Sequence, residues 1–160
     1  MGFEEVNAYL VQAGYGDRVQ EFDVSSATVE LAAQALGCPP AHIAKTLSFM
    51  ADGQPGAGIL LIVAAGDARV DNAKYKAQFH QKAKMMSAEE LERFTGLHFG
   101  GVCPFAMPAP VQVWLDVSLR RFAEVYPACG SANSAVRLSI PELEKLSKPM
   151  GWVDVCKGWA

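Results

Sequence analysis

Residues 43–65 read IAKTLSFMADGQPGAGILLIVAA, and this stretch decides the fold. Two apolar segments, 44–51 and 58–65, flank the turn-forming sequence Asp52-Gly53-Gln54-Pro55-Gly56. Apolar runs of strand length that are separated by glycine and proline predict a β-hairpin. We therefore expect a hairpin here, midway along the series of predicted strands and helices.

Helices and short strands lie on both sides of the hairpin in the chain. Apolar spacing and capping residues predict helices over residues 3–13, from a cap at Ser25, Ser26 or Thr28 to Leu36, and over 71–81, 87–96 and 139–147. Further strands are expected over 19–22, 111–115, 136–138 and 152–155, with a helical turn capped by Asp116 around Leu119 and Phe122. Since strands and helices alternate irregularly, the pattern predicts an α+β domain with a mixed sheet, not a doubly wound fold.

The composition narrows the class of protein. The chain has 160 residues, of which 51% are hydrophobic and 19% charged, and its formal charge is −3. We expect a single domain spanning residues 1–160, without intrinsic disorder or coiled coil. The longest apolar run, Ile59–Ala65, is far shorter than the roughly 20 residues that cross a membrane, so no membrane partner is expected. The mild acidity argues against a protein that coats DNA.

Cysteines and histidines are few and scattered. Cys38, Cys103, Cys129 and Cys156 form no C-x-x-C pair, and the three histidines lack zinc-ligand spacing. Because residues 2–9 do not read as a secretory segment, reduced thiols in a cytoplasmic protein are the simplest interpretation. We expect no metal and no cofactor, since no P-loop, no G-x-S-x-G and no dinucleotide-binding glycine pattern is present.

Lys45 is unusual for its position. It shares the parity of Ile43, Leu47 and Phe49 in the predicted strand, so its side chain lies on the more apolar face. One interpretation is a lysine at the start of a strand that extends to water. The other is a lysine in a cleft that holds an anionic group or polarises a reacting one.

Two predicted loops are rich in small residues. Residues 99–105 read FGGVCPF, in which Gly100 and Gly101 permit close approach of the backbone to a ligand. Such a loop can direct N–H groups at a developing oxyanion, although ordinary loops have the same composition. Residues 130–134, GSANS, predict a small polar turn.

Positive charge is concentrated in one part of the chain. The stretch 69–84 contains His80 and one acidic residue, Asp71. Its other basic residues are Arg69, Lys74, Lys76, Lys82 and Lys84. A solvated helix face is one interpretation and a surface for a phosphate backbone is the other. Arg120 and Arg121 are the next candidates for such a contact.

Four segments, taken in their order along the chain, resemble the YbaK/EbsC family. They are Ala44-Lys45-Thr46-Leu47, the apolar strand that follows, the loop 100–105, and Gly130-Ser131 ahead of Val136-Arg137-Leu138-Ser139. These proteins are stand-alone aminoacyl-tRNA deacylases related to the editing domain of bacterial prolyl-tRNA synthetases. The resemblance extends from about residue 20 to 147 and implies a mixed, partly barrel-like sheet flanked by helices. It implies hydrolysis in trans of the ester of a mischarged tRNA, of the tRNA(Pro) type, with an aminoacyl-tRNA synthetase as a candidate partner.

The resemblance also implies roles for individual residues. Lys45, Gly100 and Gly101 are expected to be catalytic. The expected substrate-binding residues are Thr28, Thr46, Leu47, Val102, Cys103, Pro104, Phe105, Gly130, Ser131 and Asn133. The expected tRNA contacts follow from charge and not from the resemblance, and they are Arg69, Lys74, Lys76, Lys82 and Lys84. Two alternatives remain: a non-catalytic binding module of the same fold, and a cysteine hydrolase that uses Cys103.

Overall fold

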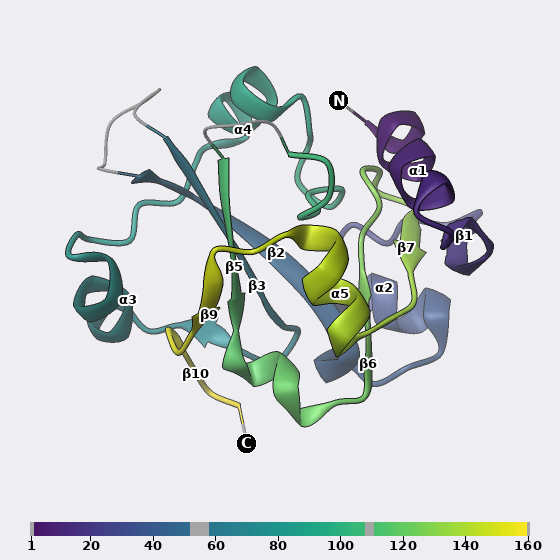
Figure 1. The fold of residues 1–160 in the computed structure, drawn as a ribbon. Coiled ribbons are helices and arrows are strands. Elements are labelled where there is room, and N and C mark those ends of the chain that lie inside the picture. The colour runs from purple at the N-terminus through teal and green to yellow at the C-terminus, as the bar shows by residue number, and fades with distance from the viewer. Residues whose placement is uncertain (1, 52–57, 108–110, 160) are drawn as a thin grey trace.

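The computed structural model describes residues 2–51, 58–107 and 111–159, which fold around a six-stranded mixed sheet (Figure 1). The strand order is β8-β6-β2-β3-β5-β9. The strands are β2 (Ile43–Met50), β3 (Ile59–Ala65), β5 (Val111–Asp116), β6 (Glu124–Pro127), β8 (Leu138–Ser139) and β9 (Gly151–Val153). The predicted hairpin is confirmed, since β2 and β3 pair antiparallel from Ala44 with Ala65 to Met50 with Ile59. The turn predicted at residues 52–56 lies outside the described residues.

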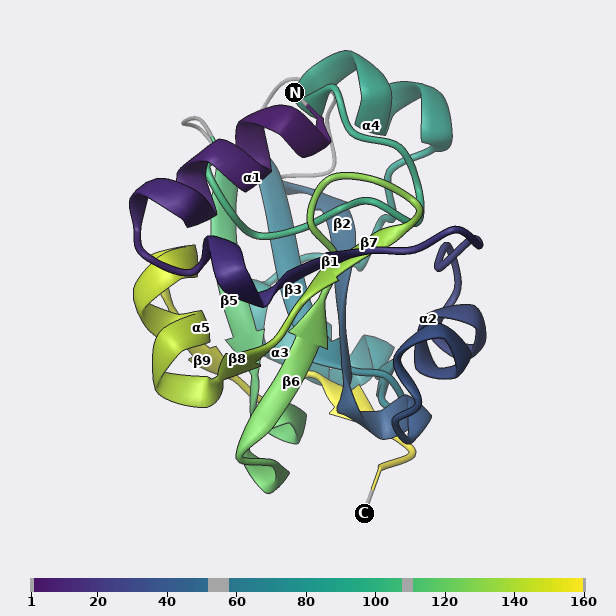
Figure 2. The same cartoon turned by 90° about the vertical axis from the view of Figure 1, so that its right-hand side faces the viewer.

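Parallel pairing extends the hairpin on both sides. β3 pairs with β5, β5 with β9, and β2 with β6, all in parallel. Two small antiparallel sheets complete the fold: β1 (Val19–Glu21) with β7 (Ser134–Val136), and β4 (Arg69–Val70) with β10 (Cys156–Lys157). The strands curl into a half barrel (Figure 2), which confirms the predicted α+β class with a mixed, partly barrel-like sheet.

Five α-helices flank the sheet within the described residues. They are α1 (Phe3–Gln12), α2 (Val29–Leu36), α3 (Asn72–Phe79), α4 (Ala88–Thr95) and α5 (Ile140–Ser147). Capping residues act as expected: Thr28 accepts from the Leu31 N–H, and Ser87 and Ser139 each form a capping box. None of these helices is both long and apolar enough to cross a membrane.

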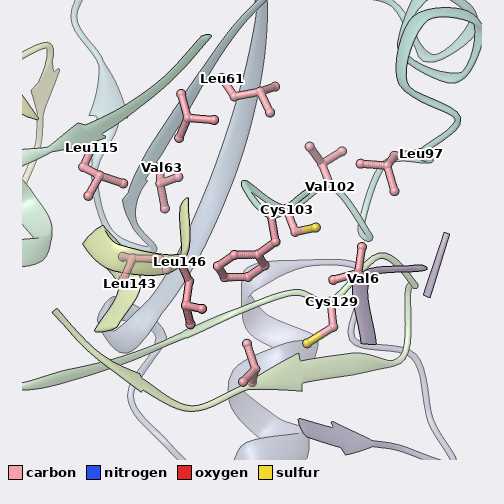
Figure 3. Packing of buried hydrophobic residues seen from close by; sticks show 14 of the residues in the cluster. Val6, Leu61, Val63, Leu97, Val102, Cys103, Leu115, Cys129, Leu143 and Leu146 are labelled. Carbon is pink, nitrogen blue, oxygen red and sulfur yellow. The ribbon is translucent and has the colours of Figure 1, made fainter. Parts of the chain in front are cut away.

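Two apolar clusters lie on opposite faces of β3. The main cluster, on the face of Leu61 and Val63, contains residues of α1, α4, α5 and the 97–105 loop (Figure 3). The second cluster, on the face of Leu60 and Ile62, contains residues of α3 and of the C-terminal segment 153–156. Because successive side chains of a strand point to opposite faces, β3 is buried over its whole length.

Some expected strands have different bounds. The strand predicted over 136–138 is divided, because β7 ends at Val136 where it pairs with β1, and β8 begins at Leu138 where it pairs with β6. Strand β6 was not predicted, since it is short and ends in a proline. The strand expected over 152–155 is β9, which ends at Val153. The turn near Leu119 is a 3₁₀-helix, η4 (Val117–Arg121), while η1 (Gly16–Arg18) and η2 (Pro40–His42) were not predicted.

A fully buried carboxylate joins three segments at one end of the sheet. Asp116 is 0% exposed, and its two carboxylate oxygens accept from the Ser118 and Val155 N–H groups, both at 3.0 Å. The Ser118 hydroxyl in turn accepts from the N–H of Ala65 at 3.1 Å. This network fixes the end of β5, the start of η4 and the C-terminal segment relative to β3.

Asp116→Ala is expected to lower the free energy of unfolding by about 3 kcal/mol, because two buried N–H groups lose a charged acceptor. Urea denaturation measures this change. The matched control is Asp154→Ala, which removes an exposed carboxylate paired with Lys74 and should change stability by less than about 1 kcal/mol. Equal effects of the two substitutions would contradict the assigned role of Asp116.

Candidate active site

A pocket of about 150 Å³ opens beside the start of β2. Its walls come from α2 and the residues before it, the loop at 99–102, the end of β6 and the start of β7. Figure 2 shows α2 next to the start of β2. The pocket brings together five of the expected site residues, namely Thr28, Lys45, Thr46, Gly100 and Val102. Among the described residues that line it, none carries a carboxylate, an imidazole or a thiol.

Lys45 is half-buried at the edge of this pocket. Its Nζ donates to the Gly66 carbonyl at 3.3 Å. Gly66 has no room for a side chain, since a Cβ there would lie 2.0 Å from the Pro40 carbonyl oxygen. Burial lowers the pKa of the Lys45 ammonium from its ordinary value, while Asp67 and Glu30 oppose that shift. The strand and the close passage of the chain at Gly66 therefore hold a cation in a fixed place.

Two buried hydroxyls in the pocket wall have no hydrogen-bond partner among the described residues. They are Ser26 Oγ and Thr46 Oγ1. Ser26 is only 7% exposed, and it does not cap α2, because Thr28 takes that role. A buried hydroxyl without a partner costs on the order of 1–3 kcal/mol, which a bound polar ligand could recover.

Part of the β2 edge near the pocket has no neighbouring strand within the described residues. β6 pairs with β2 as far as Ala44, and residues 84–86 pair with it from Ser48, where the Met86 N–H donates to the Ser48 carbonyl at 3.0 Å. Alternate residues of a strand direct their backbone groups to the same edge. The N–H and C=O of Thr46 therefore face the gap between these two neighbours.

The two glycines of the 99–105 loop lie in different surroundings. Gly100 has φ +92°, and a Cβ there would lie 2.8 Å from Ala27 Cα, so this position requires glycine. The Gly100 N–H donates no hydrogen bond to the described residues, and Gly100 lines the pocket. Gly101 does not line it: its N–H donates to the His98 carbonyl at 3.0 Å, and it packs against the backbone of Ser131.

The residues after Val102 turn into the protein. Cys103 and Phe105 are fully buried in the main cluster, as Figure 3 shows for the Cys103 side chain. Burial raises the pKa of the Cys103 thiol to about 12, so the nucleophilic thiolate is suppressed. Pro104 lines a separate hollow beside Tyr9. Leu47 packs against the second cluster, away from this pocket.

The loop 130–134 packs against the segment 22–26, which leads into the pocket wall. Gly130, Ser131 and Asn133 do not line it. The Asn133 side-chain amide donates to the Phe22 carbonyl at 3.1 Å, and Ser131 Oγ lies 2.6 Å from Ser134 Oγ. This loop therefore positions the segment that contains Ser26, and only its last residue reaches the pocket.

Sequence reasoning assigned no site role to several polar or aromatic lining residues: Ser26, which it considered only as a helix cap, Phe99 and Ser134, which it quoted only as loop members, and Tyr126. Phe99 is 51% exposed, which is unusual for so large an apolar side chain. Its place next to Gly100 was the one available signal. Tyr126 belongs to a short strand that carries no motif, and Ser134 ends the small polar loop 130–134 at the start of β7.

The basic residues of the 69–84 stretch lie outside the pocket and are all exposed. Lys74 donates to Asp154 and to the Cys156 carbonyl, both at 3.1 Å. Of the other candidate arginines, Arg121 is paired with Asp67 and Arg120 lies over the Trp152 ring, 4.2 Å from its centre. Across the described ranges, no group of three His, Cys, Asp or Glu side chains could hold a metal ion.

Comparisons with known proteins agree on one family. The family model of the aminoacyl-tRNA editing domain matches residues 23–146. The uncharacterized protein YwhH of Bacillus subtilis (strain 168) is 46% identical over 159 residues, covering 99% of both chains. Proline–tRNA ligase of Leuconostoc citreum (strain KM20) is 32% identical over 108 residues, which make up 66% of this chain but 18% of the ligase.

Comparison of the fold with solved structures agrees with the family indicated by the sequence comparisons. The crystal structure of a candidate trans-editing enzyme for prolyl tRNA synthetase superposes with a TM-score of 0.83 at 28% identity, covering 97% of this chain and 96% of that one. The resemblance inferred from the sequence is confirmed by these matches. The chain belongs to the aminoacyl-tRNA editing domain family.

Proposed function

We propose that this protein hydrolyses, in trans, the ester of mischarged aminoacyl-tRNA, with the amino acid bound in the pocket beside Lys45. The observation that carries the proposal is the pocket itself, which is lined by the half-buried Lys45 and by Ser26 and Thr46, whose hydroxyls have no partner among the described residues. Membership of the editing-domain family and similarity to part of a proline–tRNA ligase support a tRNA(Pro)-type substrate. Similarity to a candidate trans-editing enzyme supports action without a fused synthetase.

In the proposed reaction a water molecule adds to the ester carbonyl carbon, and the bond from that carbon to the ribose oxygen then breaks. The products are the free amino acid and a tRNA with a free terminal hydroxyl. Negative charge develops on the former carbonyl oxygen, and the Lys45 ammonium and Gly100 N–H supply a cation and a donor at the pocket. Because no described lining residue is a carboxylate or imidazole, we assign activation of the water to the neighbouring hydroxyl of the substrate's ribose.

The pocket walls favour a small apolar amino acid. Ala32, Ala44, Val102 and Ala135 line the cavity, whose volume is about 150 Å³. A pocket separates substrates that differ by one methylene by only about 1–3 kcal/mol, so it selects mainly by excluding larger side chains.

Lys45→Ala is expected to lower deacylation by at least about 100-fold, the effect of losing one transition-state contact. The measurement is turnover on a panel of mischarged tRNAs, with circular dichroism to establish folding. Lys145→Ala, which removes an exposed lysine of α5 outside the pocket, is the control and should retain near-normal turnover. If the folded wild-type protein binds mischarged tRNAs of the panel but hydrolyses none of them, the protein is a binding module instead.

Gly100→Ala is expected to lower deacylation by at least about 10-fold, because the new methyl group meets Ala27 and displaces the pocket wall. Gly14→Ala is a matched control. Gly14 has φ +94°, but a Cβ there would meet nothing within 4 Å, so only the backbone strain of about 1–2 kcal/mol is added. Comparable losses of activity per folded molecule in both variants would contradict the role of Gly100.

Cys103→Ser is expected to keep most of the activity per folded molecule, since the thiol lies in the main cluster and not in the pocket. The buried hydroxyl should instead lower the free energy of unfolding by about 1–3 kcal/mol. Steady-state deacylation and urea denaturation separate the two effects. Abolished turnover together with an acyl-thioester on the wild-type protein, detected by mass spectrometry, would establish the cysteine-hydrolase alternative.

A further inference from the structure

One surface hollow adjoins the active-site pocket, and a second hollow adjoins the first. The first is lined by Lys45, which also lines the pocket, and extends past Met85 and Arg69. The second lies between Lys76 and Lys82. The two hollows share Asn72 and Ala83, so together they form one groove that begins at Lys45, called here the exit groove. Its two parts have volumes of about 360 and 420 Å³, each more than twice that of the pocket.

The lining of the exit groove combines cations with apolar surface. Arg69 lines its first part, and Lys76 and Lys82 line its second, while no acidic residue lines either among those described. Leu47 and Met85 provide apolar contact area, and Met85 is 55% exposed. A row of cations along a groove follows a nucleic-acid backbone, and Leu47 and Met85 supply apolar surface where sites for single strands usually have aromatic rings.

Met85 is held in place by the sheet. It forms an antiparallel bridge with Phe49, and the Met50 N–H donates to the neighbouring Lys84 carbonyl at 2.9 Å. An exposed methionine on a backbone fixed in this way presents a constant apolar surface beside Lys45. No cluster of apolar neighbours covers its side chain among the described residues.

Two lysines of the same basic stretch lie outside the exit groove. Lys74 is bonded to Asp154 and to the Cys156 carbonyl. Lys84 lines neither hollow, although its neighbours Ala83 and Met85 do. Density of charge along the chain does not distinguish these lysines from Lys76 and Lys82, but the groove does.

We propose that the exit groove binds the unpaired 3′ strand of the tRNA acceptor end, while the terminal aminoacyl group occupies the pocket. This inference rests on the proposed function. Arg69, Lys76 and Lys82 bind successive phosphates, and Met85 packs against a base. The groove recognises the backbone and the single-stranded state, and the pocket alone selects the amino acid.

The first test compares two double variants on two substrates. Lys76→Ala/Lys82→Ala removes two groove cations, and Lys74→Ala/Lys84→Ala removes the same charge from outside the groove. On an aminoacylated acceptor-stem minihelix, the groove variant should lose about 10-fold in kcat/KM, with a salt dependence flatter by about 1.4, or 0.7 for each phosphate contact. On the amino acid ester of adenosine, which has no upstream phosphates, both variants should stay within about twofold of wild type.

The second test measures binding without hydrolysis. Fluorescence anisotropy compares an uncharged minihelix carrying its unpaired 3′ nucleotides with the same hairpin lacking them. The wild-type protein should bind the first at least about fivefold more tightly, and the groove variant and Met85→Ala should lose this preference. Equal affinity of the wild-type protein for the two RNAs, or equal losses of kcat/KM in the two double variants, would overturn the proposal that the exit groove binds the 3′ strand. If the wild-type protein prefers the RNA with unpaired 3′ nucleotides but hydrolyses neither the aminoacylated minihelix nor the adenosine ester, the result would instead contradict the proposed function.

Discussion

The structure depends on the complete burial of β3. All seven residues of this strand are covered, so both of its faces and both of its edges must be occupied. β2 and β5 occupy the edges, and the main and second clusters occupy the faces. At about 25 cal/mol per Å² of apolar surface, burial of such a strand contributes strongly to the stability of the domain. It also fixes β2 in register, which determines where Lys45 stands.

The parts of the fold that were predictable from sequence are those set by local chemistry. The apolar runs 43–50 and 59–65 and the caps Thr28, Ser87 and Ser139 act within a few residues of themselves. Strand β6 could not be predicted in this way, because it is paired with segments distant in the chain. The division between β7 and β8 likewise follows from two different pairing partners and not from the sequence between them.

The site residues that could be predicted from sequence are likewise those that stand out locally. Lys45 and Gly100 stood out because a lysine on an apolar strand face and a paired glycine are locally unusual, and both line the pocket. Residues adjacent to them in sequence were poorer guides: Leu47, Cys103 and Phe105 face apolar clusters. Ser26 and Ser134 could not be recognised, since only tertiary packing brings these common residues to one cavity.

The pocket walls are contributed by segments near residues 26–32, 43–46, 99–102 and 126–135, which are far apart in the chain. Contacts of such high sequence separation require the closure of long loops, and they generally form late in folding. A chain that has formed only its central hairpin therefore has Lys45 but no cavity around it. The cavity therefore exists only when all of these segments are in place, and a partly folded chain presents Lys45 without the walls around it.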